Sequence, residues 1–100
     1  MPTLEFVRPH GGDAEEAVRR IKLVVEDFNA RYAEYVDSVE WAADGRSATA
    51  KGKRFAATFE VDHTQVHISV ELLGLLAKVL KPKVKSKLVE KLDLYFPVAG

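Results

Sequence analysis

The sequence predicts an α+β fold: a single antiparallel sheet with an N-terminal and a C-terminal helix packed on one face, in the order β-α-β-β-β-β-α. Three observations lead to this fold. Residues 13–33 repeat apolar side chains with the period of a helix, whereas much of residues 39–71 alternates apolar and polar side chains as strands do. The turns between these strands are short, and such turns join only antiparallel neighbours. We therefore expect a helix and a meander that share one apolar layer.

A short strand over residues 3–8 precedes the first helix. Pro9 ends its ladder, because proline has no N–H to donate. Asp13 is a suitable N-cap for the helix over residues 13–33, since its carboxylate accepts hydrogen bonds from the first backbone N–H groups. One face of this helix is apolar and consists of Ala14, Ala17, Val18, Ile21, Val24, Val25, Phe28 and Tyr32.

The meander is predicted to have four strands. The first lies around Val39 and Trp41 and ends at the hairpin-turn pair Asp44-Gly45. The others span residues 46–51, 54–61 and 65–71. The last two alternate most clearly, with inward side chains at Phe55, Ala57, Phe59, Val61, Val66, Ile68 and Val70. Because their other side chains are mostly polar, one face of the sheet is free to receive the helices.

The C-terminal third differs from the rest of the chain in charge. Residues 72–100 hold six lysines against two acidic side chains, whereas residues 1–71 hold nine basic and thirteen acidic side chains. The whole chain of 100 residues, with no net charge, fits one domain, 1–100. Within it we distinguish a strand-helix-meander part, 1–71, from a leucine- and lysine-rich helical segment, 72–96.

The helical segment is expected to divide at Pro82. Lys81 precedes proline and is biased away from helical geometry, while proline suits a first helical turn. A short helix over residues 72–80 and a last helix over residues 83–95 follow from this division. The short helix is apolar almost all round, so we expect part of it to remain uncovered by a single subunit.

Several enzyme and cofactor classes have no support in the sequence. The chain has no cysteine, which excludes a disulfide scaffold, a thiol nucleophile and a cysteine-ligated metal. His63 and His67 lie on a turn and a strand, about 13 Å apart along the chain, which is too far for two ligands of one zinc ion. No serine has a nucleophile motif, and no carboxylate pair is singled out by spacing. We expect no catalytic residue, no cofactor, no metal and no enzymatic activity.

Membrane and nucleic-acid functions are disfavoured as well. The longest strongly apolar stretch, 72–80, is far shorter than the about 20 residues that cross a bilayer. The N-terminus lacks the basic and apolar regions of a signal peptide, so we expect a cytoplasmic protein. The lysine-rich segment contains no arginine fork and no free stacking aromatic, which argues against a nucleic-acid partner.

The combination of lysines beside a leucine face favours attraction to an anionic amphiphilic surface or to a partner protein. Each fully buried leucine contributes about 1.5–3 kcal/mol, so a few exposed leucines would hold the protein at an apolar surface. A second copy of the chain is the other candidate for covering the exposed leucines, and in that case the protein would be a homodimer. The candidate surface residues are Leu73, Leu75, Leu76, Leu80, Lys78, Lys81, Lys83 and Lys87.

Particular residues carry a resemblance to a known family. They are the first strand ending in Arg8-Pro9-His10, the helix closing near Phe28 and Tyr32, Trp41 with the Asp44-Gly45 turn, the strand pair 55–61 and 66–70, and the leucine-rich stretch leading into Lys83-Val84-Lys85-Ser86-Lys87-Leu88 and Lys91-Leu92-Asp93. In these features the chain resembles, nearly end to end, the small bacterial proteins of the polyhydroxyalkanoic acid system family.

The resemblance implies a granule-associated or regulatory accessory protein, because the family takes its name from genes beside those for polyhydroxyalkanoate storage. It implies no catalytic or ligand residue. Our first hypothesis is therefore a non-catalytic accessory protein that binds the polyhydroxyalkanoate granule or a granule protein. The alternative is a START-like carrier of an acyl chain between sheet and helix, an analogy of architecture alone. Its cavity would be lined by Phe55, Phe59, Val66 and Ile68.

Overall fold

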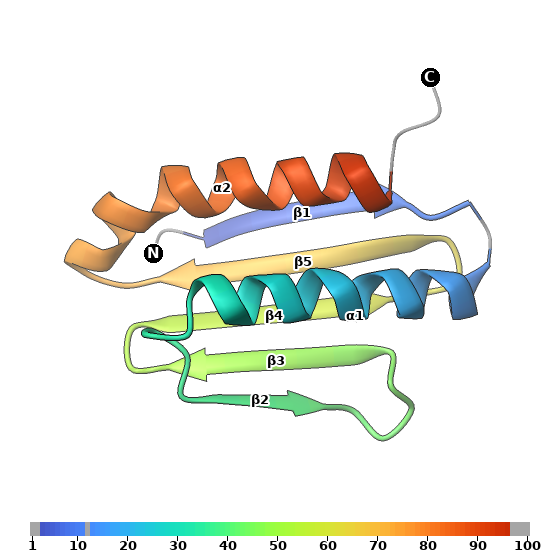
Figure 1. The fold of residues 1–100 in the computed structure, drawn as a ribbon, viewed down its shortest axis with the longest axis horizontal. Coiled ribbons are helices and arrows are strands. Elements are labelled where there is room, and N and C mark those ends of the chain that lie inside the picture. The colour runs from blue at the N-terminus through green and yellow to red at the C-terminus, as the bar shows by residue number, and fades with distance from the viewer. Residues whose placement is uncertain (1–2, 12, 97–100) are drawn as a thin grey trace.

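Five strands in one antiparallel sheet and two helices on one of its faces make up the described part of the computed structural model (Figure 1). The structure describes residues 3–11 and 13–96, apart from the side chains of Thr3, Leu75 and Leu76. The α+β fold and its predicted element order are confirmed. The elements are β1 (Thr3–Pro9), α1 (Ala14–Arg31), β2 (Ser38–Trp41), β3 (Ser47–Gly52), β4 (Phe55–Val61), β5 (Gln65–Leu72) and α2 (Leu75–Tyr95).

The strands lie side by side in the order β1-β5-β4-β3-β2. β1 pairs with β5, the last strand in sequence, so that Leu4 lies opposite Val70 and Pro9 opposite Gln65. The other pairs join strands that follow one another in the chain. β1 and β2 are thus the two edges of the sheet. Pro9 is compatible with this place, because an edge strand has unpaired N–H positions.

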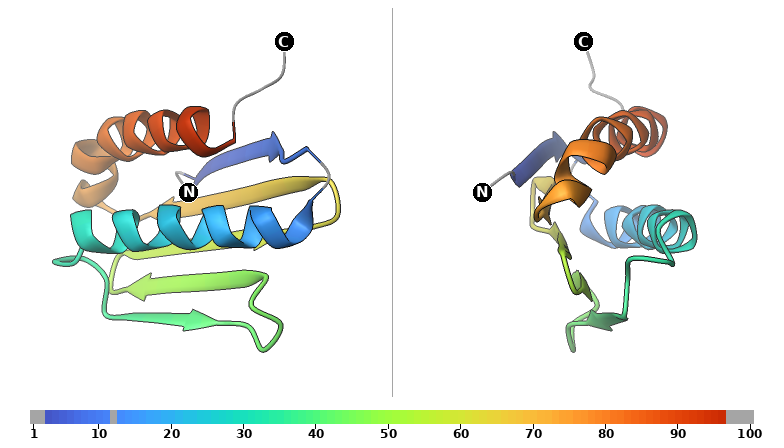
Figure 2. Two further views of the ribbon diagram at one scale, coloured as in Figure 1. Left: turned by 45° about the vertical axis from the view of Figure 1, so that its right-hand side comes forward. Right: turned by 90° about the vertical axis from the view of Figure 1, so that its left-hand side faces the viewer.

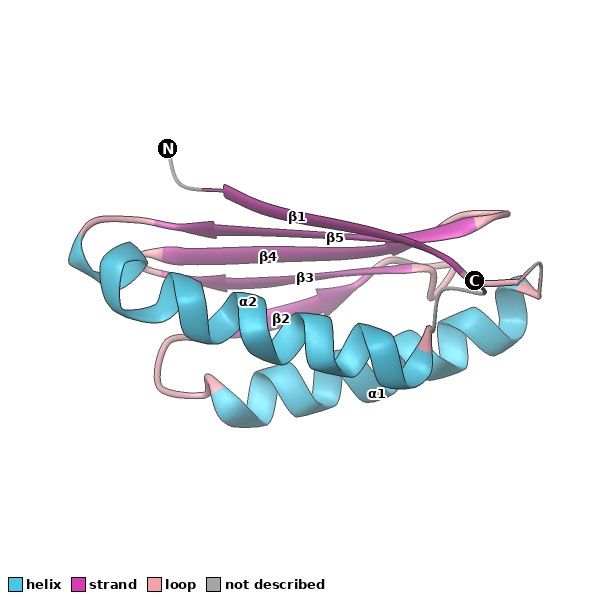
Figure 3. Cartoon of the chain, turned by 90° about the horizontal axis from the view of Figure 1, so that it is seen from above, coloured by secondary structure: helices cyan, strands magenta, loops and turns pink. Residues whose placement is uncertain are grey.

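Both helices cover the same face of the sheet, as the side and top views show (Figures 2 and 3). α1 packs on β4 near the middle, whereas α2 packs on β5 and β1 toward one edge, and the two helices contact each other. The buried side chains form a core between the sheet and the helices. From the sheet they include Phe55, Ala57, Phe59, Val61, Val66, Ile68, Val70 and Leu72.

α1 is specified by its own sequence. The Asp13 carboxylate accepts hydrogen bonds from the backbone N–H groups of Glu15 and Glu16, at 3.1 and 3.2 Å, and so caps the helix. The aromatic ring of Phe28, on its buried side, lies 5.4 Å from the ring of Phe55 and 5.4 Å from that of Phe59. These contacts anchor the C-terminal half of α1 on β4.

α2 corrects the prediction of two separate helices. It runs without a break from Leu75 to Tyr95, with Pro82 inside it, and Figure 1 shows that its first turns are bent against the rest. Proline removes a helical hydrogen bond and usually kinks or ends a helix. Here Leu80 and Val84, on either side of Pro82, are both buried in the core. Packing on the sheet therefore outweighs the local cost of proline.

The start of the leucine-rich stretch also differs from the prediction. Leu72 is the last residue of β5 and is buried, so it belongs to the sheet rather than to a helix. Gly74 has a φ of 64°, a conformation that residues with a Cβ rarely adopt, and it turns the chain from β5 into α2. The helix therefore begins three residues later than expected.

Candidate functional site

The predicted surface leucines do not form one exposed cluster. Leu80 is only 5% exposed, so its assignment to a binding surface is wrong: it faces the sheet, in line with Ala77 and Val84. Leu73 lies at the surface, 36% exposed, just before the helix. The side chains of Leu75 and Leu76 lie outside the described residues.

Val79 is an exposed apolar residue of α2 that the sequence analysis missed, with 58% of its surface accessible. The buried side chains of the helix recur at spacings of three and four and are Ala77, Leu80, Val84, Leu88 and Leu92. A single helical wheel drawn through Pro82 places residue 79 away from that stripe. The signal was present, but dividing the segment at Pro82 separated the two halves of the stripe.

The predicted lysines do gather on one part of α2. Lys78, Lys81 and Lys83 are exposed and Lys87 is partly buried. Together with Lys85 they form what we call the lysine segment, residues 78–87, and no acidic residue occurs between positions 72 and 89. Lys87 pairs with Glu90, its Nζ lying 3.3 Å from Oε2. The other four lysines make no ion pair with the described residues.

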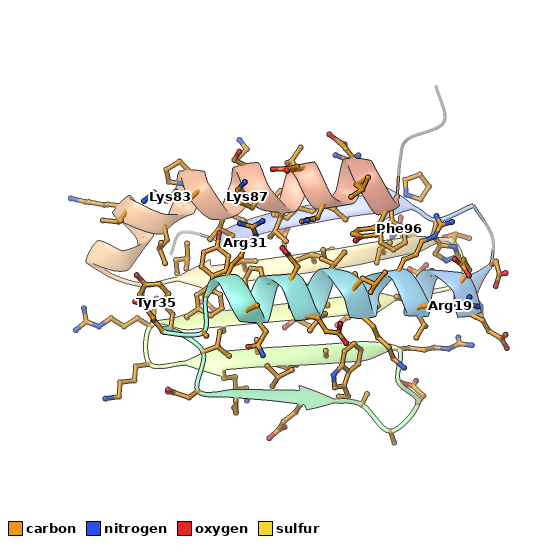
Figure 4. All side chains as sticks on the ribbon, viewed as in Figure 1. Arg19, Arg31, Tyr35, Lys83, Lys87 and Phe96 are labelled. Carbon is orange, nitrogen blue, oxygen red and sulfur yellow. The ribbon has the colours of Figure 1, made fainter. Side chains whose placement is uncertain are left out.

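A groove lies beside the lysine segment, where the C-terminal end of α1 faces α2. It has a volume of about 640 Å³. Figure 4 shows its labelled cations, Arg31 from α1 and Lys83 and Lys87 from α2, gathered along this junction. We call it the α1–α2 groove; its lining residues are Arg31, Tyr32, Pro82, Lys83, Ser86 and Lys87.

The positive charge of the α1–α2 groove is only partly neutralised. Arg31 Nε donates to Asp27 Oδ2 at 2.9 Å, and Lys91 Nζ lies 3.7 Å from the other oxygen of Asp27. The terminal nitrogens of Arg31 have no partner among the described residues. This junction therefore holds four cations and two carboxylates. Arg31 and Lys91 pair with Asp27, Lys87 pairs with Glu90, and Lys83 has no ion pair among the described residues.

Tyr32 forms an inner wall of the groove. Its side chain is 7% exposed, and its ring lies 4.9 Å from the ring of Phe28. Burial raises the pKa of the Tyr32 hydroxyl, an effect that the charge of Arg31 opposes and that of Asp27 reinforces. The hydroxyl therefore remains protonated at neutral pH and is able to donate a hydrogen bond.

The residues of the carrier alternative occupy the core. Phe55, Phe59, Val66 and Ile68 are each at most 3% exposed. Neither the α1–α2 groove nor a second hollow of about 460 Å³ between α1 and β2 has any of the four in its lining. Phe55 lines a smaller hollow of about 170 Å³ at the start of β4, beside Lys53 and Leu73. The carrier function stays a prediction.

Across residues 3–11 and 13–96, no three His, Asp or Glu side chains lie together as a metal ion would require. None of the helices that the structure describes is apolar and long enough to span a membrane. Trp41 is 39% exposed on β2, with Lys22 Nζ 6.0 Å from its ring centre.

The fold and this surface define a small α+β protein with a cationic groove between its two helices. A family model described as "Putative polyhydroxyalkanoic acid system protein" matches residues 4–96, from the start of β1 to the end of α2. The chain belongs to this family, as the resemblance indicated. No curated protein and no solved structure matches it.

Proposed function

We propose that the protein is a non-catalytic accessory protein of the polyhydroxyalkanoate system that attaches to the granule surface through the lysine segment. One observation carries the proposal: five lysines in ten residues of α2, with no carboxylate among them. Exposed Val79 lies within this segment, and exposed Leu73 lies just before the helix. Cations around a few apolar side chains are the pattern that binds an anionic amphiphilic surface.

Helix stability does not explain this arrangement of charge. The positive end of a helix dipole lies at its N-terminus, where acidic side chains are favourable and basic ones unfavourable. The first turn of α2 contains Lys78 and no acidic residue, and Gly74 at its N-cap makes no side-chain hydrogen bond. Lys78 therefore opposes the local preference of the helix, as side chains retained for binding often do.

The lysine segment has enough charge for useful affinity. Lys83 and Lys87 line the α1–α2 groove, which leaves Lys78, Lys81 and Lys85 for the surface. A lysine near an anionic amphiphilic surface contributes on the order of 1 kcal/mol, so these three would contribute about 3 kcal/mol before ordering costs. Val79 and Leu73 add apolar contact. Since the interaction is exposed, it weakens as salt screens the charges. A granule-bound location in the cell follows from this mode of binding.

Cosedimentation with polyester particles tests the proposal. The probes are polyhydroxybutyrate particles coated with oleate, which is anionic, and the same particles coated with a neutral detergent. We expect the wild-type protein to pellet with the oleate-coated particles and to be released by salt. The double variant Lys78→Gln/Lys81→Gln should stay in the supernatant. Its matched control is Lys51→Gln/Lys53→Gln, which removes two exposed lysines outside α2.

Two results would overturn the proposal. One is equal pelleting of the Lys78→Gln/Lys81→Gln variant and its control, which would show that binding does not depend on the lysine segment. The other is binding to native granules that disappears when their proteins are digested, with no binding to oleate-coated particles. That second result would identify a granule protein as the partner instead of the surface.

A further inference from the structure

The α1–α2 groove has a chemistry that surface attachment does not require. A flat anionic surface is met by exposed lysines alone, yet Arg31 and Tyr32 come from another helix and lie inside the groove. We propose that the α1–α2 groove binds the carboxylate end of a short hydroxyalkanoate chain. The choice of this acid rests on the proposed function, whereas the class of ligand, a monoanion with a short aliphatic body, rests on the groove itself.

The charge of the groove suits a carboxylate. Arg31, Lys83 and Lys87 converge from two helices, and Arg31 has its terminal nitrogens available because Asp27 is bonded at Nε. A guanidinium edge binds the two oxygens of a carboxylate in parallel, which gives geometry as well as strength. Lys83 has no ion-pair partner among the described residues and adds a second, mobile donor.

The surroundings of these cations favour a single negative charge over a phosphate dianion. The groove lies at the C-terminal end of α1, where the helix dipole places partial negative charge. Asp27 lies within ion-pair distance of Arg31, and Glu90 within ion-pair distance of Lys87. The remaining excess of positive charge is modest. None of the described residues that line the groove belongs to the first turn of a helix, so they offer no backbone N–H cradle like that of many phosphate sites.

The walls of the groove suit the remainder of the hydroxyalkanoate ligand. The rings of Tyr32 and Pro82 present apolar surface, and the Tyr32 and Ser86 hydroxyls are able to pair with a hydroxyl or an ester carbonyl. A volume of about 640 Å³ falls within the about 300–1,000 Å³ of typical small-molecule sites. A hydroxyalkanoate carries all three features that these walls recognise: an acid, oxygen acceptors and a short alkyl group.

An NMR titration of the full chain tests the proposal directly. The probes are short soluble oligomers of β-hydroxybutyrate, the methyl esters of the same oligomers, and inorganic phosphate. We expect the free acids to shift the backbone amide signals of Arg31, Tyr32, Lys83 and Ser86, while the neutral esters and phosphate leave them unchanged. Equal shifts with the ester, or with phosphate, would overturn the assignment of the ligand.

Variants place the binding in the groove. Arg31→Gln removes the guanidinium, and Ser86→Leu fills the groove without changing charge. Each should weaken binding of the oligomer at least about ten-fold. Lys78→Gln/Lys81→Gln, which lies on the same helix outside the groove, should not. Thermal unfolding checks that each variant folds, and unchanged affinity in both folded groove variants would overturn the proposal.

The same variants separate this inference from the proposed function. Arg31→Gln should lose the oligomer and still pellet with oleate-coated particles, whereas Lys78→Gln/Lys81→Gln should behave in the opposite way. Displacement of the oligomer by particles with free carboxyl ends, but not by particles with esterified ends, would identify the polymer chain end as the source of the acid. Failure of both particles to displace it would identify the free acid.

Discussion

The two helices lie side by side on one sheet, but their charges are arranged in opposite ways. α1 has a capping aspartate, acidic residues in its first turn and Arg31 in its last turn. Its Glu16–Arg20 and Asp27–Arg31 pairs follow the spacing that stabilises helices. α2 has no acidic residue in its first turn, no basic residue in its last, and a proline inside.

This difference indicates that the first half of α2 is the region in which to look for function. The Asp13 cap and the ion pairs within α1 support the helix itself, while Arg20, which donates to the Tyr95 carbonyl, and Asp27, which lies near Lys91, also link it to α2. Among the described side chains, Ala77, Leu80 and Val84 bury the first half of α2 on the sheet, whereas Lys78 in its first turn and Pro82 are unfavourable for a helix. Substitutions in the two helices test this comparison, and a further one concerns the β4–β5 turn.

Phe28→Ala is expected to have the largest effect. The Phe28 side chain is 3% exposed and its ring contacts Tyr32, Phe55 and Phe59, so its loss leaves a cavity between α1 and β4. We expect the free energy of unfolding to fall by about 3–5 kcal/mol. Urea denaturation followed by circular dichroism measures it. The control Leu23→Ala, on the exposed side of the same helix, should change stability by less than about 1 kcal/mol.

Pro82→Ala is expected to stabilise the protein. Alanine is about 3 kcal/mol more favourable than proline inside a helix, and the proline returns part of this by restricting the unfolded chain, so the net gain is about 2 kcal/mol. The same denaturation experiment measures the gain, with Ser86→Ala as the matched exposed change. A lower or unchanged stability of Pro82→Ala would show that the proline does not strain α2. The variant should also bind the oligomer more weakly, because one apolar wall is lost.

Lys78→Glu and Glu15→Lys form a mirrored pair in the first turns of α2 and α1. Replacing the lysine by glutamate should raise the free energy of unfolding by about 0.5 kcal/mol, and the reverse change in α1 should lower it by a similar amount. Thermal unfolding at low and high salt measures both, and the differences should shrink as salt rises. If Lys78→Glu destabilises the protein, the lysine supports the fold and our comparison of the helices fails.

Asp62→Asn is expected to have the smallest effect and concerns the β4–β5 turn. The backbone N–H groups of Thr64 and Gln65 donate to the Asp62 carboxylate and lower its pKa below 3.8. A lowered folded pKa adds stability that is present above pH 3.8 and is lost as the pH falls through the folded value. Asp62→Asn should therefore be slightly less stable than wild type at neutral pH, and the difference should vanish in acid.

The control for this turn is Glu34→Gln, an exposed change with no described hydrogen bond or ion pair. Its stability should match that of wild type at both pH values. A difference between wild type and Asp62→Asn that persists in acid would mean that the turn geometry, and not the charge, is affected by the substitution.

Much of the fold was predictable because most of its helices and strands are indicated by local sequence patterns. The stripe of α1 and the alternation of β4 and β5 are periodic over many residues, and the bounds predicted from them differ from the observed ones by at most two positions. The pairing of β1 with β5 was not predictable in this way. It joins residues 3–9 to residues 65–71, and no local pattern specifies a partner so distant in sequence.

The candidate site was predicted less completely. Lys83 and Lys87 were expected at a binding surface, and the structure places both in the α1–α2 groove, but Arg31 and Tyr32 were not among the expected residues. Arg31 and Tyr32 occur at the end of a regular amphipathic helix and have no motif of their own. Leu80 was assigned to the surface because the leucine-rich stretch alone does not say which side of it meets the sheet.

The sequence by itself determined the class of fold, the elements before α2 and the concentration of lysines in residues 78–87, because each depends on composition and on spacing within one segment. Only the tertiary structure decided that α2 continues through Pro82, that Leu80 is buried, and that two helices enclose a cationic groove. The reason is physical: burying Leu80 and Val84 together on the sheet outweighs the preference of a single proline, and that burial exists only once the sheet has formed.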